Sequence, residues 1–153
     1  MRPAKWTAGN FIARAAAANA VMTASQHLEI ALTRRSASDL PVRIMERLTG
    51  RAVTGRVARI AVGQTTQSLL AASAVTLARV IPRLPVVVAI AAESLLLVMA
   101  NAAVARMLNL GDMPWSWSQH ELAADFTHKT SLATTAVLLT RGQQSAHAAL
   151  PIG

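Results

Sequence analysis

Residues 85 to 105, PVVVAIAAESLLLVMANAAVA, form the most apolar stretch of the chain. A helix that crosses a membrane needs about 20 mostly apolar residues, and this run reaches that length. It also contains an acidic residue, Glu93, near its middle. A charged side chain that faces lipid costs at least about 2.5–3.5 kcal/mol. The run therefore predicts a membrane helix that turns Glu93 toward other helices.

The composition supports the same class of protein. Of the 153 residues, 53% are apolar and 14% are charged, whereas soluble domains carry about 25% charged residues. The chain therefore has too few charges to cover a water-facing surface fully. Alanine, leucine and valine are abundant and glycine and proline are sparse, which favours helices. The chain has no cysteine, so disulfides and thiolate metal sites are excluded.

Four segments have helical composition and a length close to that of a membrane span. They cover residues 10–32, 59–80, 86–108 and 119–140. Hydropathy alone identifies only the third. We expect an all-α fold, a four-helix transmembrane bundle that occupies residues 1–142 as a single domain, followed by a C-terminal tail at residues 143–153.

A short amphipathic helix is expected between the first two long helices, in the segment SASDLPVRIMERLTG. Leu40, Ile44 and Leu48 recur every four residues and would share one face. Ser38 or Asp39 can cap its start, and a glycine follows its last residues. Such a helix would lie along the membrane interface. The alternative is a solvated helix that covers one end of a soluble bundle.

The net charge of +8 is concentrated near this helix. Seven arginines lie in residues 34–59 against two acids, an excess that is typical of cytoplasmic loops of membrane proteins. We expect Arg43, Arg47 and Arg51 to bind anionic lipid head groups. A nucleic-acid partner is not expected, because the basic residues are not interleaved with aromatic ones and no DNA-binding motif is present.

The connection before the last long helix carries a clear start signal. Ser118 and Glu121 have the spacing of a capping box, which places the helix start at about Gln119. Trp115 and Trp117 precede it, and tryptophan is enriched at membrane interfaces. The connection is therefore expected at the membrane surface.

The N-terminal sequence MRPAKWTAGNFIARAAAANA allows two readings besides a first helix. Its basic start and its A-x-A-like end suggest a secretory signal peptide, and the absence of acids before Glu29 suggests a mitochondrial presequence. Arg14 interrupts the would-be apolar core. A retained first helix is therefore the favoured interpretation.

The order of these features resembles a known group of proteins. A first helix, the S-D-x-P segment at residues 38–41, the amphipathic RIMERLTG, two apolar helices and a last helix with histidine follow one another. In this order the chain resembles small four-helix integral membrane proteins of bacteria and archaea, whose function is uncharacterised. The resemblance implies the fold and a location, which we expect to be the bacterial inner membrane. It carries over no catalytic residue.

Polar residues from four predicted helices fall at one depth, roughly 5–9 Å from the bilayer centre at about 1.5 Å rise per residue. They predict a buried hydrogen-bonded layer of His27, Gln64, Gln67, Asn101, Asp125 and His128. Asp125 and His128 share one helix face and, with His27, are also candidate metal ligands. The spacing matches no established metal motif, so a packing network is favoured and no metal is expected.

Glu93 lies on the other side of the bilayer centre, with Lys129 and Arg14 as candidate partners. Lys129 is near the middle of an antiparallel helix, within reach of a long side chain. We expect Glu93 and Lys129 to form a buried charge pair. The functional alternative is a carboxyl group that carries protons.

No catalytic motif is present: the chain has no glycine-rich phosphate loop, no nucleophile elbow and no recognisable pair of catalytic carboxylates. We expect a protein that is not an enzyme and has no cofactor. It would act as an accessory or assembly subunit of a larger membrane complex, in contact with lipids and with other subunits or copies of itself. One alternative is a proton, ion or metal conduit built on Glu93, Lys129, Asp125 and His128. Another is a soluble alanine-rich helical bundle that binds a partner.

Overall fold

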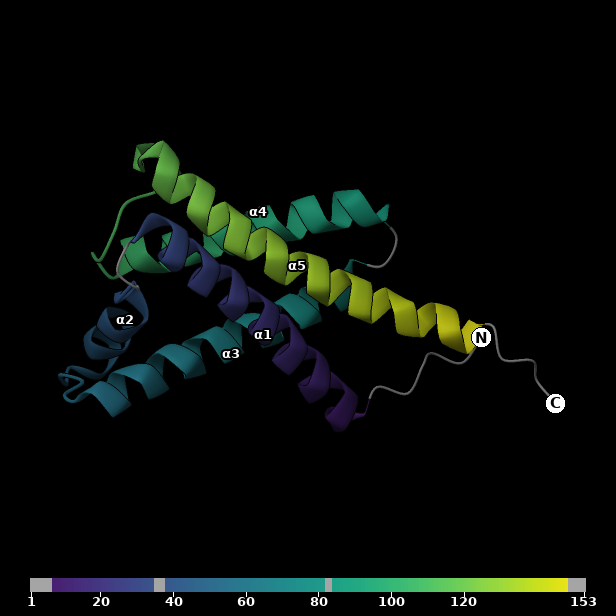
Figure 1. Ribbon diagram of the computed structural model, residues 1–153, viewed down its shortest axis with the longest axis horizontal. Helices are drawn as coiled ribbons and strands as arrows, with labels where there is room; N and C mark the ends of the chain where they lie inside the picture. The colour runs from purple at the N-terminus through teal and green to yellow at the C-terminus, as the bar shows by residue number, and fades with distance from the viewer. Residues whose placement is uncertain (1–6, 35–37, 82–83, 149–153) are drawn as a thin grey trace.

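The fold is an all-α bundle of five helices (Figure 1). The computed structural model describes residues 7–34, 38–81 and 84–148, and only the backbone of residues 143–148. Four long helices and one short helix follow each other, with a 3-10 turn before the last. They are α1 (Ala8–Thr33), α2 (Leu40–Thr49), α3 (Arg56–Val80), α4 (Val86–Met107), η1 (Pro114–Ser116) and α5 (Gln119–Ala148). The predicted order of four long helices and one short helix is confirmed.

Local hydrogen bonds explain where the helices begin and end. The Thr7 side chain accepts from the backbone N–H of Asn10 and caps α1. Gly50 ends α2 in the left-handed conformation, with φ of 65°, which glycine adopts without steric cost. At α5, Ser118 Oγ accepts from the N–H of Glu121 at 3.2 Å, and the Glu121 carboxylate accepts from the N–H of Ser118 at 3.0 Å. The predicted capping box is therefore present.

The end of α5 differs from the prediction. We expected this helix to stop at residue 140 and a tail to begin at residue 143, but α5 continues to Ala148. Gly142 lies inside the helix instead of ending it. A glycine in a helix interior weakens the helix without necessarily stopping it, and the next residues in the chain, Gln143 and Gln144, are good helix formers.

The long helices alternate in direction along the long axis of the molecule (Figure 1). The start of α1 and the end of α5 lie toward one end, and α2 lies at the other. The central helix is α5, which contacts α1, α3 and α4. In contrast, α4 packs mainly against α5 and makes fewer contacts with α3, so it lies at the periphery of the bundle.

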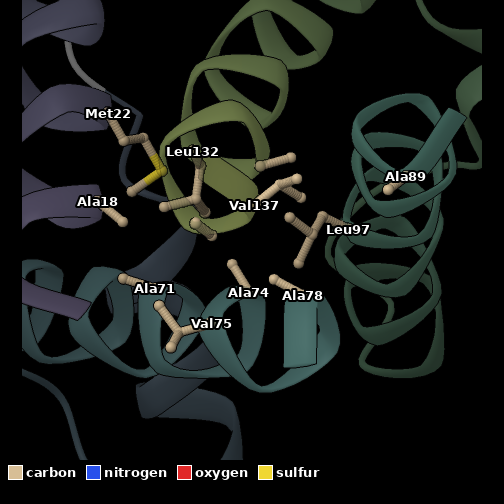
Figure 2. Packing of buried hydrophobic residues seen from close by; sticks show 12 residues of the cluster. Ala18, Met22, Ala71, Ala74, Val75, Ala78, Ala89, Leu97, Leu132 and Val137 are labelled. Carbon is tan, nitrogen blue, oxygen red and sulfur yellow. The ribbon is translucent and has the colours of Figure 1, made fainter. Parts of the chain in front are cut away.

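The core is built mostly from alanine. Leu132 and Val137 of α5 lie at its centre, between Met22 of α1 and Ala74 of α3, with Leu97 of α4 on the far side (Figure 2). Small residues let helix backbones approach closely, which gives dense packing without large side chains. Many of the other large apolar residues are exposed, such as Leu32, Val87 and Leu95.

Among the described residues, α4 alone is long and apolar enough to cross a membrane. Its 22 residues would span about 33 Å at 1.5 Å per residue, slightly more than a bilayer core of about 30 Å. This agrees with the expectation that hydropathy alone identifies only this segment, and a membrane-spanning role for the other three long helices stays a prediction. The other long helices contain too many polar side chains, such as Arg14, Glu29 and Arg59.

Candidate functional site

The most connected polar cluster joins α1 to α5. Ser25 Oγ lies 2.9 Å from Nδ1 of His128, and Nε2 of His128 lies 4.0 Å from Oε2 of Glu29. His128 is 8% exposed. Ser25 and Glu29 are four residues apart and therefore share one face of α1. The two helices thus place a hydroxyl and a carboxylate on either side of one buried imidazole.

This order of groups has the composition of a nucleophilic triad, but its surroundings do not suit acyl transfer. A Ser–His–acid site also needs N–H donors that stabilise the oxyanion. Ser25 lies well inside α1, where the backbone N–H groups are engaged in helical hydrogen bonds. The cluster therefore lacks the surroundings of an acyl-transfer site. Its contacts join α1 to α5.

A shallow groove of about 310 Å³ lies beside this cluster, between α1 and α5. Ser25, Glu29 and His128 supply polar groups to it, and Leu28 and Leu32 supply an apolar wall. Both leucines are exposed, at 61% and 76%. The groove therefore combines one charged group with an apolar surface, as small-molecule sites commonly do.

A second polar contact joins α1 to α3. Nε2 of Gln67 donates to Oε1 of Gln26 at 2.7 Å, and the Thr23 hydroxyl donates to Oε1 of Gln67 at 3.2 Å. All three side chains are half-buried. Both Nε2 and Oε1 of Gln67 therefore have a hydrogen-bond partner, as buried polar groups generally do.

The predicted polar layer is therefore correct in part. His128 and Gln67 make hydrogen bonds between helices. His27 and Gln64 are exposed and do not contribute to a buried layer. Asn101 is half-buried on α4, which makes at most minor contact with α1.

The exposure of His27 and Gln64 follows from helix geometry. Successive residues of a helix point about 100° apart, so with Gln26 directed at α3 its neighbour His27 points elsewhere. The buried residues of α3 all lie from Ala71 onward. Gln64 is therefore on the half of α3 that does not reach the core.

Four members of these contacts were missed by the sequence reasoning: Thr23, Ser25, Gln26 and Glu29. The signal was present, because Ser25 and Glu29 are spaced by four and Thr23 and Gln26 by three, which puts each pair on one helix face. The prediction compared the depth of residues along the helices, but it considered direction around the helix only for Asp125 and His128.

The predicted charge pair between Glu93 and Lys129 is wrong. Nζ of Lys129 binds Oδ1 of Asp125 at 3.0 Å, four residues earlier on α5. Lys129 is 6% exposed. An acid at i−4 on the same helix is within reach without any adjustment between helices. Asp125 therefore provides the counter-charge that we assigned to Glu93.

Glu93 itself is fully buried, with an exposure of 0%, so the prediction that it faces protein is confirmed. Neither carboxyl oxygen has a hydrogen-bond partner among the described residues. Its neighbour Ser94 donates to the carbonyl of Ile90 and leaves the carboxyl group unmatched. A buried polar group without a partner is destabilising, which marks Glu93 as a position with a possible role beyond packing.

The arginines expected at lipid head groups have different surroundings. Arg43 and Arg51 are exposed, as head-group binding requires. Arg47 is also exposed, but its Nε donates to the carbonyl of Leu108 at 3.2 Å and ties α2 to the end of α4. Lipid binding by these three residues stays a prediction.

The candidate metal ligands do not converge. His27 is exposed, whereas Asp125 pairs with Lys129 and His128 contacts Ser25. Within the described ranges, no group of three or more histidine or acidic side chains has the arrangement of a metal site.

Comparisons with known proteins were made with protein-family models, with curated proteins and with solved structures. None of the three finds a match to this chain. The resemblance to small four-helix membrane proteins therefore stays a prediction, and the function has to be argued from the geometry of the bundle alone.

Proposed function

We propose that this protein is a small helical membrane protein that acts as a non-catalytic accessory or assembly subunit. The observation that carries the proposal is an apolar exposed face on α4 combined with charged and polar side chains in the interior of the bundle. Besides alanine and several larger apolar side chains, the buried positions include Glu93, His128 and Lys129. Large apolar side chains are exposed on α4, including Val87 at 77% and Leu95 at 55%.

This distribution suits a hydrocarbon environment. In lipid, apolar side chains lose nothing by facing outward, whereas polar ones are driven to the interior of the bundle. In water, an exposed helix face of this kind would promote aggregation. Lipid and protein partners both cover such a face, and a peripheral α4 leaves it open to either.

The subunit role follows from what the bundle offers. The polar clusters are small and lie between packed helices, and the groove beside His128 is shallow. Assembly, in contrast, needs only accessible helix faces and a defined orientation. The arginine-rich end would provide the orientation by the positive-inside rule.

A proton or ion conduit is the second candidate, and one observation favours it. Glu93 is buried with no hydrogen-bond partner in the described part of the chain, and ionisable residues inside membrane helices are often functional. A conduit predicts that Glu93→Gln abolishes flux in proteoliposomes. An accessory subunit predicts no such flux from the purified protein.

Membrane fractionation tests the proposal directly. The protein should sediment with membranes and stay there after carbonate extraction. Leu95→Glu with Leu96→Glu should reduce membrane recovery strongly, because both side chains are exposed on α4 and charge in lipid is costly. Ser116→Glu with Gln119→Glu is the matched control, because both side chains are polar and exposed at the connection into α5, and it should leave membrane recovery unchanged. Recovery of the unaltered protein in the soluble fraction without detergent would contradict the proposal.

A further inference from the structure

The groove between α1 and α5 carries a negative charge at one position. Glu29 is the acidic residue of its lining. Oε1 of Glu29 accepts from the Thr33 hydroxyl at 3.3 Å, and Oε2 lies 4.0 Å from His128, with a fifth of the side chain exposed. A neutral His128 that accepts from Ser25 at Nδ1 carries its proton on Nε2, toward Glu29. Oε2 of Glu29 therefore faces the imidazole, and the exposed part of the carboxyl group leaves room for one more donor.

The rest of the groove surface is mostly apolar. Leu28 and Leu32 form one wall, and Ala123 and Ala124 line the opposite side. Its volume of about 310 Å³ is at the lower end of the range for small-molecule sites. That volume suits a head group and the first part of its tail, with the remaining hydrocarbon lying over the exposed leucines.

We propose that this groove binds an aminophospholipid through its primary ammonium group. The inference rests on the proposed membrane location. The ammonium would donate to Glu29, the acyl chains would cover Leu28 and Leu32, and the phosphate would face basic groups at the same end of the molecule. These groups are His120, which lines the groove, and Arg34, an exposed residue directly after Thr33 at the end of α1.

Charge complementarity selects this occupant over other lipids. An anionic lipid without an amine would place no donor on Glu29 and would bring its phosphate toward a carboxylate. A quaternary ammonium has no N–H to donate and is bulkier near the carboxylate. A primary ammonium has three donors, is smaller than a quaternary one and complements the charge of Glu29.

Lipid competition followed by native mass spectrometry tests the inference. Delipidated protein in mild detergent is mixed with equal amounts of phosphatidylethanolamine, phosphatidylcholine and phosphatidylglycerol with identical acyl chains. We expect retention of phosphatidylethanolamine over the other two, and Glu29→Gln should reduce it about tenfold, the usual scale for loss of one charged hydrogen bond. Ala123→Phe, which fills the groove but keeps Glu29, should reduce it as well.

Asp112→Asn is the matched control, because it removes one exposed negative charge outside the groove. It should retain the lipid like the unaltered protein. Equal retention of all three lipids, or a preference for phosphatidylglycerol, would overturn the inference. If the protein and Glu29→Gln both remain in membranes in that case, the proposed membrane role stands. Recovery of the protein in the soluble fraction would contradict both.

Discussion

At the scale of single residues, the buried charges show how local geometry decides between partners. Two acidic residues were candidate partners for Lys129: Glu93 on α4 and Asp125 on α5, the helix that also carries Lys129. It pairs with Asp125 at 3.0 Å. An i,i+4 pair forms whenever the helix forms, whereas a pair between helices also requires the correct rotation of both. The nearer acid is therefore satisfied, and Glu93 is left without a partner in the described residues.

This arrangement makes a prediction for Glu93 that differs from a charge pair. Glu93→Met keeps the volume of the side chain and removes the unmatched carboxyl group. It should stabilise the protein by about 1–3 kcal/mol, the typical cost of a buried polar group without a hydrogen bond. The measurement is thermal unfolding in detergent, followed by circular dichroism.

Leu97→Met is the control for this experiment. Leu97 is 2% exposed and lies one turn further along α4, and a swap of similar volume should change the stability little. A lower unfolding midpoint for Glu93→Met would mean that the carboxyl group has a stabilising partner. A conduit role would still allow the stabilised variant to lose function, since functional sites often cost stability.

Residue-level prediction from the sequence was therefore correct for the burial of Glu93 and wrong for its partner. The cost of charge in lipid was enough to predict that Glu93 is buried. The partner depended on helix rotation and on competition from Asp125, and hydropathy carries no information on either. The contact of His128 with Ser25 depended on the same rotation.

At the scale of helices, short-range signals were sufficient for most boundaries. Capping residues act on the first turn of a helix, so their effect can be read from a few adjacent positions. Ser118 and Glu121 started α5 at the expected residue, and Gly50 ended α2. Near the end of α5, Gly142 resembles a stop signal but lies inside the helix, which is why the continuation to Ala148 was missed.

The capping box of α5 gives a prediction at this scale. Ser118→Ala removes the acceptor for the N–H of Glu121 and should destabilise the protein by about 1 kcal/mol. The effect should be global, because α5 contacts α1, α3 and α4. Ser131→Ala is the control on the same helix: its hydroxyl only donates to the carbonyl of Thr127, and its loss should be close to neutral. Equal effects of the two substitutions in thermal unfolding would argue against the cap.

At the scale of the whole molecule, the polarity of the bundle and its charge asymmetry determine how it would sit in a membrane. The exposed face of α4 is apolar. The core consists mostly of small side chains and contains a few polar ones. The number and direction of long helices could be predicted from the sequence, because each segment is about as long as a bilayer is thick. The central position of α5 could not, because it depends on how the alanine faces of several helices fit together.

Thr54 precedes the start of α3 and Leu84 follows its end, so the length of this helix separates them, and both side chains are exposed. The arginine-rich segment that includes Thr54 should remain in the cytoplasm by the positive-inside rule. A cysteine at Thr54 should therefore react with a membrane-impermeant maleimide only after the cells are opened, and a cysteine at Leu84 should react in intact cells. The chain has no cysteine of its own, so each label reports one site. Protection of both sites in intact cells, or the reverse pattern, would contradict this orientation.

Replacing Arg43 and Arg51 by glutamine should weaken the difference in labelling between the two sites, because the positive charge that orients the protein is then reduced.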